Sequence, residues 1–145
     1  RMGARTEEVK QLFSTSLEEY AATASLAARA EVYLGCAISV AGELPPKAQV
    51  AVPQAANDLL TIDGVEASFV AVEQNGGVHI SARSMGAVNV QVILETLGGG
   101  GHLTMAGAQL KGVNQDEARR RIQDAVRAFR QEQAEKARSS AAQTE

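Results

Sequence analysis

A strictly alternating segment in the middle of the chain constrains the fold more than any other feature. Residues 78–83 place apolar side chains on one face and polar side chains on the other: Val78, Ile80 and Ala82 against His79, Ser81 and Arg83. This period of two is typical of a β-strand with one face in the core. A second strand-like run covers residues 65–73, and Asn75-Gly76 between the two runs favours a tight turn. The sequence therefore predicts a β-hairpin.

Further strands and helices are predicted on both sides of this hairpin. Apolar residues recur at helical spacing in residues 1–30 and 88–97. A short helix is predicted from Pro53, a residue favoured at the first helical position, to about Leu60. Residues 32–40 form a continuous apolar run of strand length, and a short strand is expected near residues 108–110. The order of these elements predicts an α/β domain, with a mixed sheet of about four or five strands flanked by helices.

The last predicted helix begins at Asn114, whose side chain is expected to cap it, with Glu117 completing a capping-box pair. Its apolar stripe fades from residue 131 onward, where a polar tail is expected to be frayed. No long linker or internal repeat divides the chain, so one domain is expected.

The composition restricts the chemistry of any site. The chain has one Cys, two His and four Asp, which excludes an internal disulfide and makes a metal-dependent active site hard to build. Aromatic residues are 3% of the chain and the net charge is -3, which counts against a nucleic-acid surface. No apolar run reaches the ~20 residues that span a bilayer. These features predict a soluble, intracellular protein.

Four consecutive glycines, Gly98, Gly99, Gly100 and Gly101, stand directly before His102. Gly98 is well placed to cap the preceding helix. The remaining glycines favour a loop whose N–H groups approach an anionic ligand, although a structural tight turn is the alternative. His102 is then a candidate donor to phosphate or to a base, although a lone His is most often structural or merely exposed.

Side chains near the glycines add to this candidate site. Arg83 matches the geometry of a phosphate, and Ser81 is predicted beside it on an accessible strand face. A surface salt bridge is the alternative for Arg83. Asn89 and Thr104 are weaker candidates, because Asn89 is also placed to cap a helix and Thr104 to fill space. His79 is expected to be exposed and without a role.

Four segments together resemble the DHHA1 domain, the substrate-binding half of DHH-family phosphoesterases. They are Ile80-Ser81-Ala82-Arg83-Ser84, Asn89-Val90-Gln91, Leu97-Gly98-Gly99-Gly100-Gly101-His102 and Ala106-Gly107. The resemblance covers about residues 5–130 and is greatest to cyclic-di-AMP phosphodiesterases. It implies that Ser81 and Arg83 meet phosphate or ribose, and that Gly99, Gly100, Gly101 and His102 line a nucleotide pocket. The chain departs from the family pattern at Met105 and Gly107, where relatives carry Asn and Ala.

The resemblance also implies a partner lobe. In the family a DHH domain holds two metal ions, usually manganese, through Asp and His residues that this chain lacks. Residues 1–30 are then expected to be the connector from that DHH domain, residues 31–130 the DHHA1 domain and residues 131–145 a polar tail. The chain alone is expected to be inactive and to lie on the cytoplasmic side, within a parent protein that is membrane-anchored in some relatives.

The function implied is that of the nucleotide-binding lobe of a metal-dependent phosphodiesterase acting on cyclic di-AMP. An alternative is a nucleic-acid-binding or short-oligonucleotide-binding module of a DHH-family exonuclease or oligoribonuclease. A third is an interaction domain that forms a homodimer through its first helix. The expected partners are accordingly a cyclic dinucleotide or a short oligonucleotide, the DHH domain and a second copy of the chain.

Overall fold

The predicted hairpin forms the centre of a sheet. The computed structural model describes residues 16–144, and in it β3 (Ala67–Gln74) pairs antiparallel with β4 (Gly77–Ser84). Asn75 and Gly76 have φ angles of 50° and 77°, the two left-handed conformations that a type I′ turn requires. The alternation is also confirmed, because the apolar residues of β4 are fully buried: Val78, Ile80 and Ala82.

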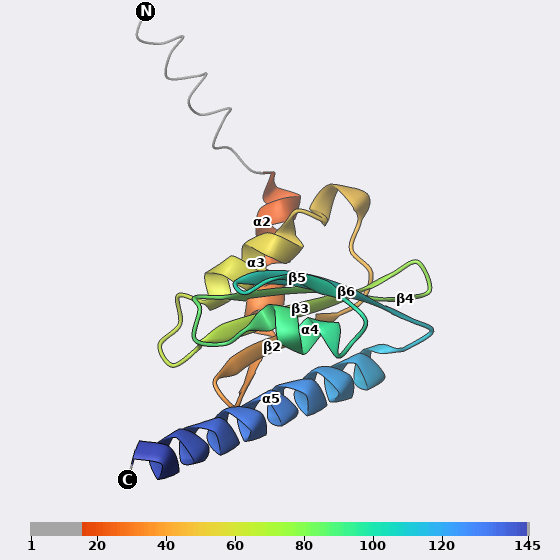
Figure 1. Ribbon diagram of the computed structural model, residues 1–145. Helices are drawn as coiled ribbons and strands as arrows, with labels where there is room; N and C mark the ends of the chain where they lie inside the picture. The colour runs from red at the N-terminus through yellow and green to blue at the C-terminus, as the bar shows by residue number, and fades with distance from the viewer. Residues whose placement is uncertain (1–15, 145) are drawn as a thin grey trace, which may run out of the picture.

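The sheet has six strands within the described residues, in the order β1-β2-β3-β4-β6-β5 (Figure 1). Its other strands are β1 (Glu31–Tyr33), β2 (Cys36–Ala41), β5 (Gly100–His102) and β6 (Met105–Lys111). The β2–β3 pair is parallel and the other neighbouring pairs are antiparallel. The mixed α/β class is confirmed, and the strand number is six because a three-residue strand closes each edge.

The apolar run at residues 32–40 is two strands rather than the single buried strand predicted. It folds into the β1–β2 hairpin through a turn in which Leu34 and Gly35 have φ angles of 51° and 78°. Val32 is 61% exposed because β1 is an edge strand. Arg130 holds this turn: its Nε donates to the Leu34 carbonyl at 3.0 Å and its Nη2 to Glu66 Oε1 at 2.8 Å. A leucine in a left-handed conformation is uncommon, and Gly35 is the turn signal that the sequence carries there.

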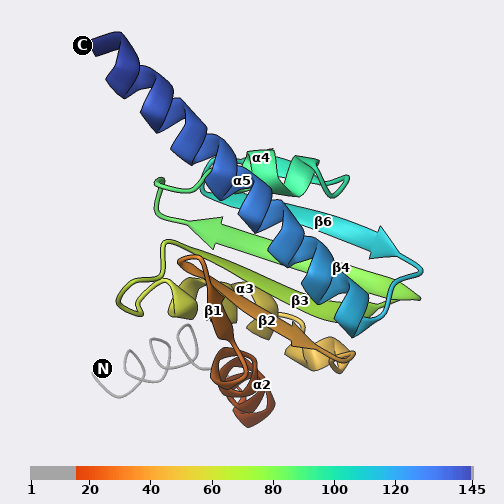
Figure 2. The same cartoon turned by 90° about the horizontal axis from the view of Figure 1, so that it is seen from below.

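Two helical layers cover the sheet. On one face lie α2 (Leu17–Ala28) and α3 (Ala51–Leu59), and on the other lie α4 (Val90–Glu95) and α5 (Gln115–Thr144), as Figures 1 and 2 show. A short 3-10 helix, η1 (Pro46–Ala48), precedes α3. The helix predicted at residues 53–60 thus begins two residues earlier and ends one residue earlier. For the helix predicted over residues 1–30, α2 is the observed part, and residues 1–15 lie outside the described range.

The two helical layers bury different sets of strands. The core beneath α4 and α5 draws on β2, β3, β4 and β6, with Phe69, Ile80, Ile93 and Ile122 among its fully or almost fully buried side chains. The core beneath α2 and α3 contains side chains of β2 and β3 but, within residues 16–144, none of β4, β5 or β6. On the α2/α3 side, helix α3 also contacts β4, whereas no apolar core lies over β6 and β5 within the described residues.

Helix α5 begins as predicted but ends much later. Asn114 Oδ1 accepts from the Glu117 backbone N–H at 2.9 Å, which confirms the cap. The helix continues to Thr144 instead of fraying near residue 131, and Figure 2 shows its C-terminal turns extending past the sheet. Ala, Glu, Gln, Lys and Arg are strong helix formers, so this segment remains helical without an apolar stripe. Within the described residues, none of the helices combines the length and the apolar character needed to cross a bilayer.

Candidate functional site

The four glycines divide between a helix end and an edge strand. Gly98 has a φ of +84°, its N–H donates to the Glu95 carbonyl at 3.1 Å, and the Gly99 N–H donates to the Leu94 carbonyl at 2.8 Å. This pair of bonds is the Schellman pattern that closes a helix, so the predicted cap at Gly98 is confirmed. Gly100 and Gly101 continue into β5, which pairs antiparallel with β6. The segment is a paired strand rather than the open loop that the glycines suggested.

Close packing between β5 and β6 explains two of the remaining glycines. A Cβ atom at Gly99 would lie 2.1 Å from the Gly107 carbonyl oxygen, and one at Gly101 would lie 2.4 Å from the Met105 carbonyl oxygen. A Cβ atom at Gly100 would meet nothing within 4 Å, and the backbone there is not left-handed. Gly100 is therefore the glycine that intramolecular packing does not require.

The register of the sheet brings the candidate residues into rows. Ser81 on β4 lies opposite Gly107 on β6, which lies opposite Gly100 on β5. Directly opposed residues of paired strands point to the same side of the sheet, here the α2/α3 side, where α3 contacts β4 and no apolar core of the described residues lies over β6 and β5. On the same side of the sheet, two further rows of opposed residues flank the Ser81–Gly107–Gly100 row. They are Arg83–Met105–His102 on one flank and His79–Gln109 on the other. We call these eight residues the polar face, and Gly100 with Gly107 the glycine floor.

Arg83 carries the permanent positive charge of the polar face. Its Nη1 donates to the Ala82 carbonyl at 2.9 Å, whereas its Nε is buried and has no hydrogen-bond acceptor among the described residues. Partial burial lowers the pKa of the Arg83 guanidinium from its ordinary value, although the group remains protonated at any physiological pH. The predicted alternative, a surface salt bridge, is not formed with any carboxylate in residues 16–144. A guanidinium without a carboxylate partner among the described residues suits an oxyanion ligand.

Ser81 and His79 lie closer together than the sequence suggested. Ser81 is 9% exposed, so its hydroxyl lies at the base of the polar face rather than on an open surface. His79 is half-buried, and its Nε2 is 3.4 Å from Ser81 Oγ. The expectation that His79 is exposed is wrong. The strand alternation already places it on the same face as Ser81 and Arg83, which is the signal that identifies it.

The turn between β5 and β6 fixes His102 at the rim of the polar face. The Thr104 carbonyl accepts from the Ser84 N–H at 3.0 Å, and the Leu103 carbonyl accepts from the Val90 N–H at 3.1 Å. The backbone of the turn is thus tied to the end of β4 and the start of α4. The side chains of His102 and Thr104 are both exposed. Thr104 contributes to the site through its backbone, while His102 presents its ring to solvent beside Met105.

Asn89 is not brought to the polar face. Its Oδ1 accepts from the Val92 N–H at 3.3 Å and caps α4, as predicted, beside a cavity of about 210 Å³ between α4 and α5. We expect Asn89→Ala to lower the free energy of unfolding by about 1 kcal/mol, the usual worth of a helix cap, and to leave ligand affinity unchanged. Denaturant unfolding and calorimetric titration measure the two quantities. A binding defect at unchanged stability would restore Asn89 to the site.

A metal site is not formed by the described residues. Within residues 16–144 no group of three or more His, Cys, Asp or Glu side chains lies close enough to hold an ion. His79 and His102, the two histidines of the chain, lie on different strands of the polar face without a carboxylate opposite either of them in the register. The polar face therefore offers contacts for a ligand and no built coordination sphere.

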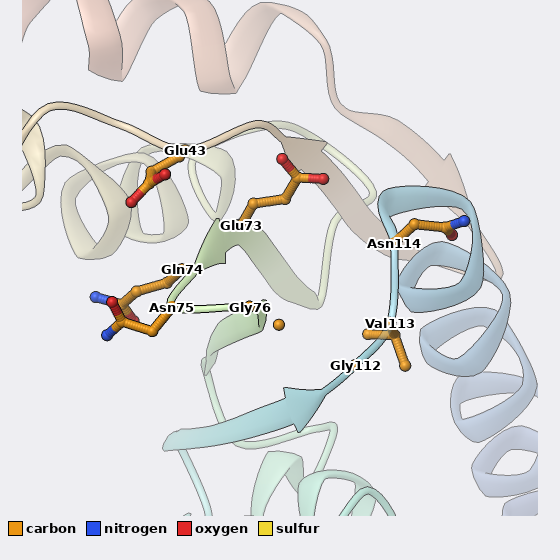
Figure 3. Close-up of a pocket in the computed structure, with 9 residues that line it drawn as sticks. Glu43, Glu73, Gln74, Asn75, Gly76, Gly112, Val113 and Asn114 are labelled. Atoms are coloured by element: carbon orange, nitrogen blue, oxygen red, sulfur yellow. The ribbon is translucent and has the colours of Figure 1, made fainter.

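A second hollow lies at the other end of β4 and β6 (Figure 3). Its volume is about 510 Å³, and its lining is mostly polar: Glu43, Glu73, Gln74, Asn75, Gly76, Gly77, Gly112, Val113 and Asn114. The carboxylates of Glu43 and Glu73 disfavour an anionic ligand there. None of the residues that the sequence singled out for binding lines this hollow, so the polar face is the better candidate for a phosphate.

Comparison with known families agrees with this geometry. The family model described as "DHHA1 domain" matches residues 43–134, which is well over half of the chain and includes all of the polar face. The chain belongs to the DHHA1 domain family. The segments that suggested this family from the sequence, including the four glycines and His102, lie within the matched range of the DHHA1 domain.

Similar proteins include two kinds of phosphoesterase. Cyclic-di-AMP phosphodiesterase GdpP of Geobacillus thermodenitrificans is 47% identical over 126 residues, which cover 86% of this chain and 19% of the relative. Bifunctional oligoribonuclease and PAP phosphatase NrnA of Thermus thermophilus is 48% identical over 66 residues, which cover 43% of this chain and 20% of the relative. The DHHA1 chain therefore spans about a fifth of the length of these curated relatives.

The fold has solved counterparts. An exopolyphosphatase-related protein from Bacteroides fragilis superposes with a TM-score of 0.72 at 19% identity, over 86% of this chain and 39% of that chain. At this identity the likeness concerns the fold alone. It supports the order of helices and strands described above for the DHHA1 domain.

Proposed function

We propose that this DHHA1 domain is the nucleotide-binding lobe of a phosphodiesterase that hydrolyses cyclic di-AMP. The observation that carries the proposal is Arg83, whose buried Nε has no acceptor among the described residues and which adjoins the uncovered glycine floor. Similarity to a cyclic-di-AMP phosphodiesterase along most of the chain supports the choice of nucleotide.

The polar face can bind a phosphodiester in a defined way. Arg83 donates two hydrogen bonds to phosphate oxygens, and the Ser81 hydroxyl donates a third from the base of the face. Gly100 and Gly107 carry no side chains, so a ribose or a flat base can approach the backbone between the flanking rows. His102, at the exposed rim, is placed to contact the base or the second phosphate.

The role of this chain is binding and orientation. The resemblance implies a metal-dependent reaction, with manganese as the usual ion, and metal ions activate water and stabilise charge at phosphorus. The described residues do not fit such a site, so we assign the metal ligands to a DHH domain of a longer parent protein. In that arrangement this lobe lies on the cytoplasmic side and holds the substrate against the DHH domain.

Calorimetric titration of the 145-residue chain with cyclic di-AMP tests the proposal. We expect one-to-one binding of cyclic di-AMP. Cyclic di-GMP should bind more weakly, because guanine presents different hydrogen-bond donors and acceptors from adenine. Absence of any binding of cyclic di-AMP at millimolar concentration would refute the proposed function. Titration at two salt concentrations distinguishes binding of a compact dinucleotide from binding of a longer nucleic-acid strand, because the affinity for a longer strand falls more steeply with salt.

A second function is favoured by the 66-residue match to the oligoribonuclease NrnA. In this case the polar face holds the end of a short RNA strand instead of a cyclic dinucleotide. The same titration with a linear di-adenylate and a short oligoadenylate discriminates the two. If either linear ligand binds at least tenfold more tightly than cyclic di-AMP, the oligonucleotide function replaces the first proposal.

The isolated chain is expected to bind without hydrolysing. Incubation with cyclic di-AMP and manganese should leave the nucleotide intact, as followed by chromatography of the products, because the described residues form no metal site. Hydrolysis that depends on manganese and persists after further purification would show that the catalytic groups lie in this chain.

A further inference from the structure

The pair formed by His79 and Ser81 gives the polar face a feature that binding by Arg83 alone does not explain. His79 Nε2 and Ser81 Oγ are 3.4 Å apart, at the long end of the hydrogen-bond range. A Cβ atom at Gly107 would lie 4.0 Å from His79 Cε1, so the imidazole ring also borders the glycine floor. His79 is half-buried, and Ser81 is its one hydrogen-bond partner within the described part of the chain.

The direction of this hydrogen bond decides what Ser81 can offer to a ligand. If His79 Nε2 accepts the hydroxyl proton, Ser81 Oγ presents only lone pairs to the floor, and these repel a phosphate oxygen. If Nε2 carries a proton, it donates to Ser81 Oγ and the Ser81 O–H is free to donate outward. When the His79 imidazole is protonated, Nε2 always donates to Ser81 Oγ, and the ring adds a positive charge beside the phosphate.

We infer that His79 is a positioning residue, which sets the hydroxyl of Ser81 as a donor toward the phosphate held by Arg83. This inference rests on the proposed function and deepens it, because it assigns a role to a residue outside the glycines and the Ser81–Arg83 pair. It makes ligand affinity higher when the His79 ring is protonated than when its Nε2 accepts the Ser81 proton.

The charged groups around His79 are few. On its own strand the neighbour is Arg83, and on β6 the neighbours on the same face are Gln109, which is opposite His79, and Lys111, which is exposed. On β3 the opposed residue is the apolar Val72, while Glu73 alternates to the other face. On α3 the acidic residue is Asp58, which is exposed and accepts a hydrogen bond from Gln54. On β5, His102 is the other histidine of the polar face.

Cyclic di-AMP is a suitable probe because its two phosphodiesters stay ionised between pH 5.5 and pH 8. Any change of affinity with pH in this range therefore comes from the protein. We expect wild-type affinity to rise roughly tenfold from pH 8 to pH 5.5, the worth of one hydrogen bond to an ionised group. His79→Gln, whose amide N–H can donate to Ser81 at every pH, should bind with little pH dependence. His79→Ala removes both the acceptor that competes for the Ser81 hydroxyl proton and the positive charge, so it should bind without pH dependence, with an affinity between the wild-type values at pH 8 and pH 5.5.

The variant His102→Gln removes the other histidine of the polar face; because the proposed function places His102 against the ligand, its overall affinity should fall, and only its pH dependence is compared with that of the wild type. The inference predicts that it keeps the pH dependence, and that the ¹⁵N resonances of the His79 ring report a proton on Nε2 in the complex. Loss of the pH dependence in His102→Gln, or its persistence in His79→Gln, would overturn the inference and leave the proposed function standing. Failure of the wild type to bind cyclic di-AMP at any pH would overturn both.

Discussion

Replacing Gly99 by alanine is expected to lower the free energy of unfolding by about 3 kcal/mol, as an overpacked core position does. The new Cβ would lie 2.1 Å from the Gly107 carbonyl oxygen and 2.6 Å from Ala108 Cβ. Both atoms belong to the neighbouring strand β6, so relief requires β5 to move away from the sheet. Gly101→Ala should be similarly destabilising, because Gly101 has a φ of +148° and its Cβ would lie 2.4 Å from the Met105 carbonyl oxygen.

Gly100→Ala is the matched control, since Gly100 lies between Gly99 and Gly101 and begins β5. Its Cβ has open space, and alanine is easier to order in a strand than glycine, so the free energy of unfolding should change by less than about 1 kcal/mol. Urea denaturation of the three variants measures the contrast. Equal destabilisation by Gly100→Ala would mean that the glycines are required by the turn as a whole rather than by contacts at individual positions.

Ligand affinity should rank the same glycines differently. The Cβ of Gly100→Ala would stand on the polar face beside Gly107, where the proposed ligand approaches. We expect at least roughly tenfold weaker binding of cyclic di-AMP by a variant that is still folded, the effect of a methyl group that blocks one close contact. Unchanged affinity would place the ligand away from the glycine floor and would leave Gly100 without a functional explanation.

The sequence predicts the central hairpin well because its signals are local. Alternation from Val78 to Ala82 and the Asn75-Gly76 turn need no information from distant residues. The edge strands could not be predicted in this way. Strand β1 turns at Leu34, which has no intrinsic preference for the left-handed conformation, and the turn is held by Arg130 from the far end of the chain. Tertiary contacts thus override local preference at the edges.

The candidate site shows the same division. Residues of the site that share β4 could be placed on one face from sequence alone, including His79, Ser81 and Arg83. The glycine floor could not, since Gly107 and Gly100 come together only through the register of β6 against both β4 and β5. The reason for each glycine likewise depends on how closely β5 approaches β6, a distance that no pattern in the sequence reports.

Arg83→Ala is expected to weaken binding of cyclic di-AMP by about 100-fold or more. Two charge-assisted hydrogen bonds to phosphate are lost, each worth about 1.5 kcal/mol or more. The stability of the protein should not fall in parallel, because the Arg83 Nε has no acceptor among the described residues and its removal relieves a desolvated donor. The free energy of unfolding is therefore expected to stay constant or to rise, while the affinity for cyclic di-AMP falls.

Two further variants separate geometry from charge at this position. Arg83→Lys keeps the positive charge but loses the planar fork, so it should recover only part of the lost affinity. Arg138→Ala removes a positive charge from the exposed end of α5 and should change affinity by less than about twofold, because that charge is screened from the polar face. If Arg83→Lys binds as tightly as the wild type, Arg83 acts as a point charge and its unsatisfied Nε is not the phosphate contact. If Arg138→Ala weakens binding as much as Arg83→Ala, the affinity depends on the net charge of the protein, and the polar face is not the binding site.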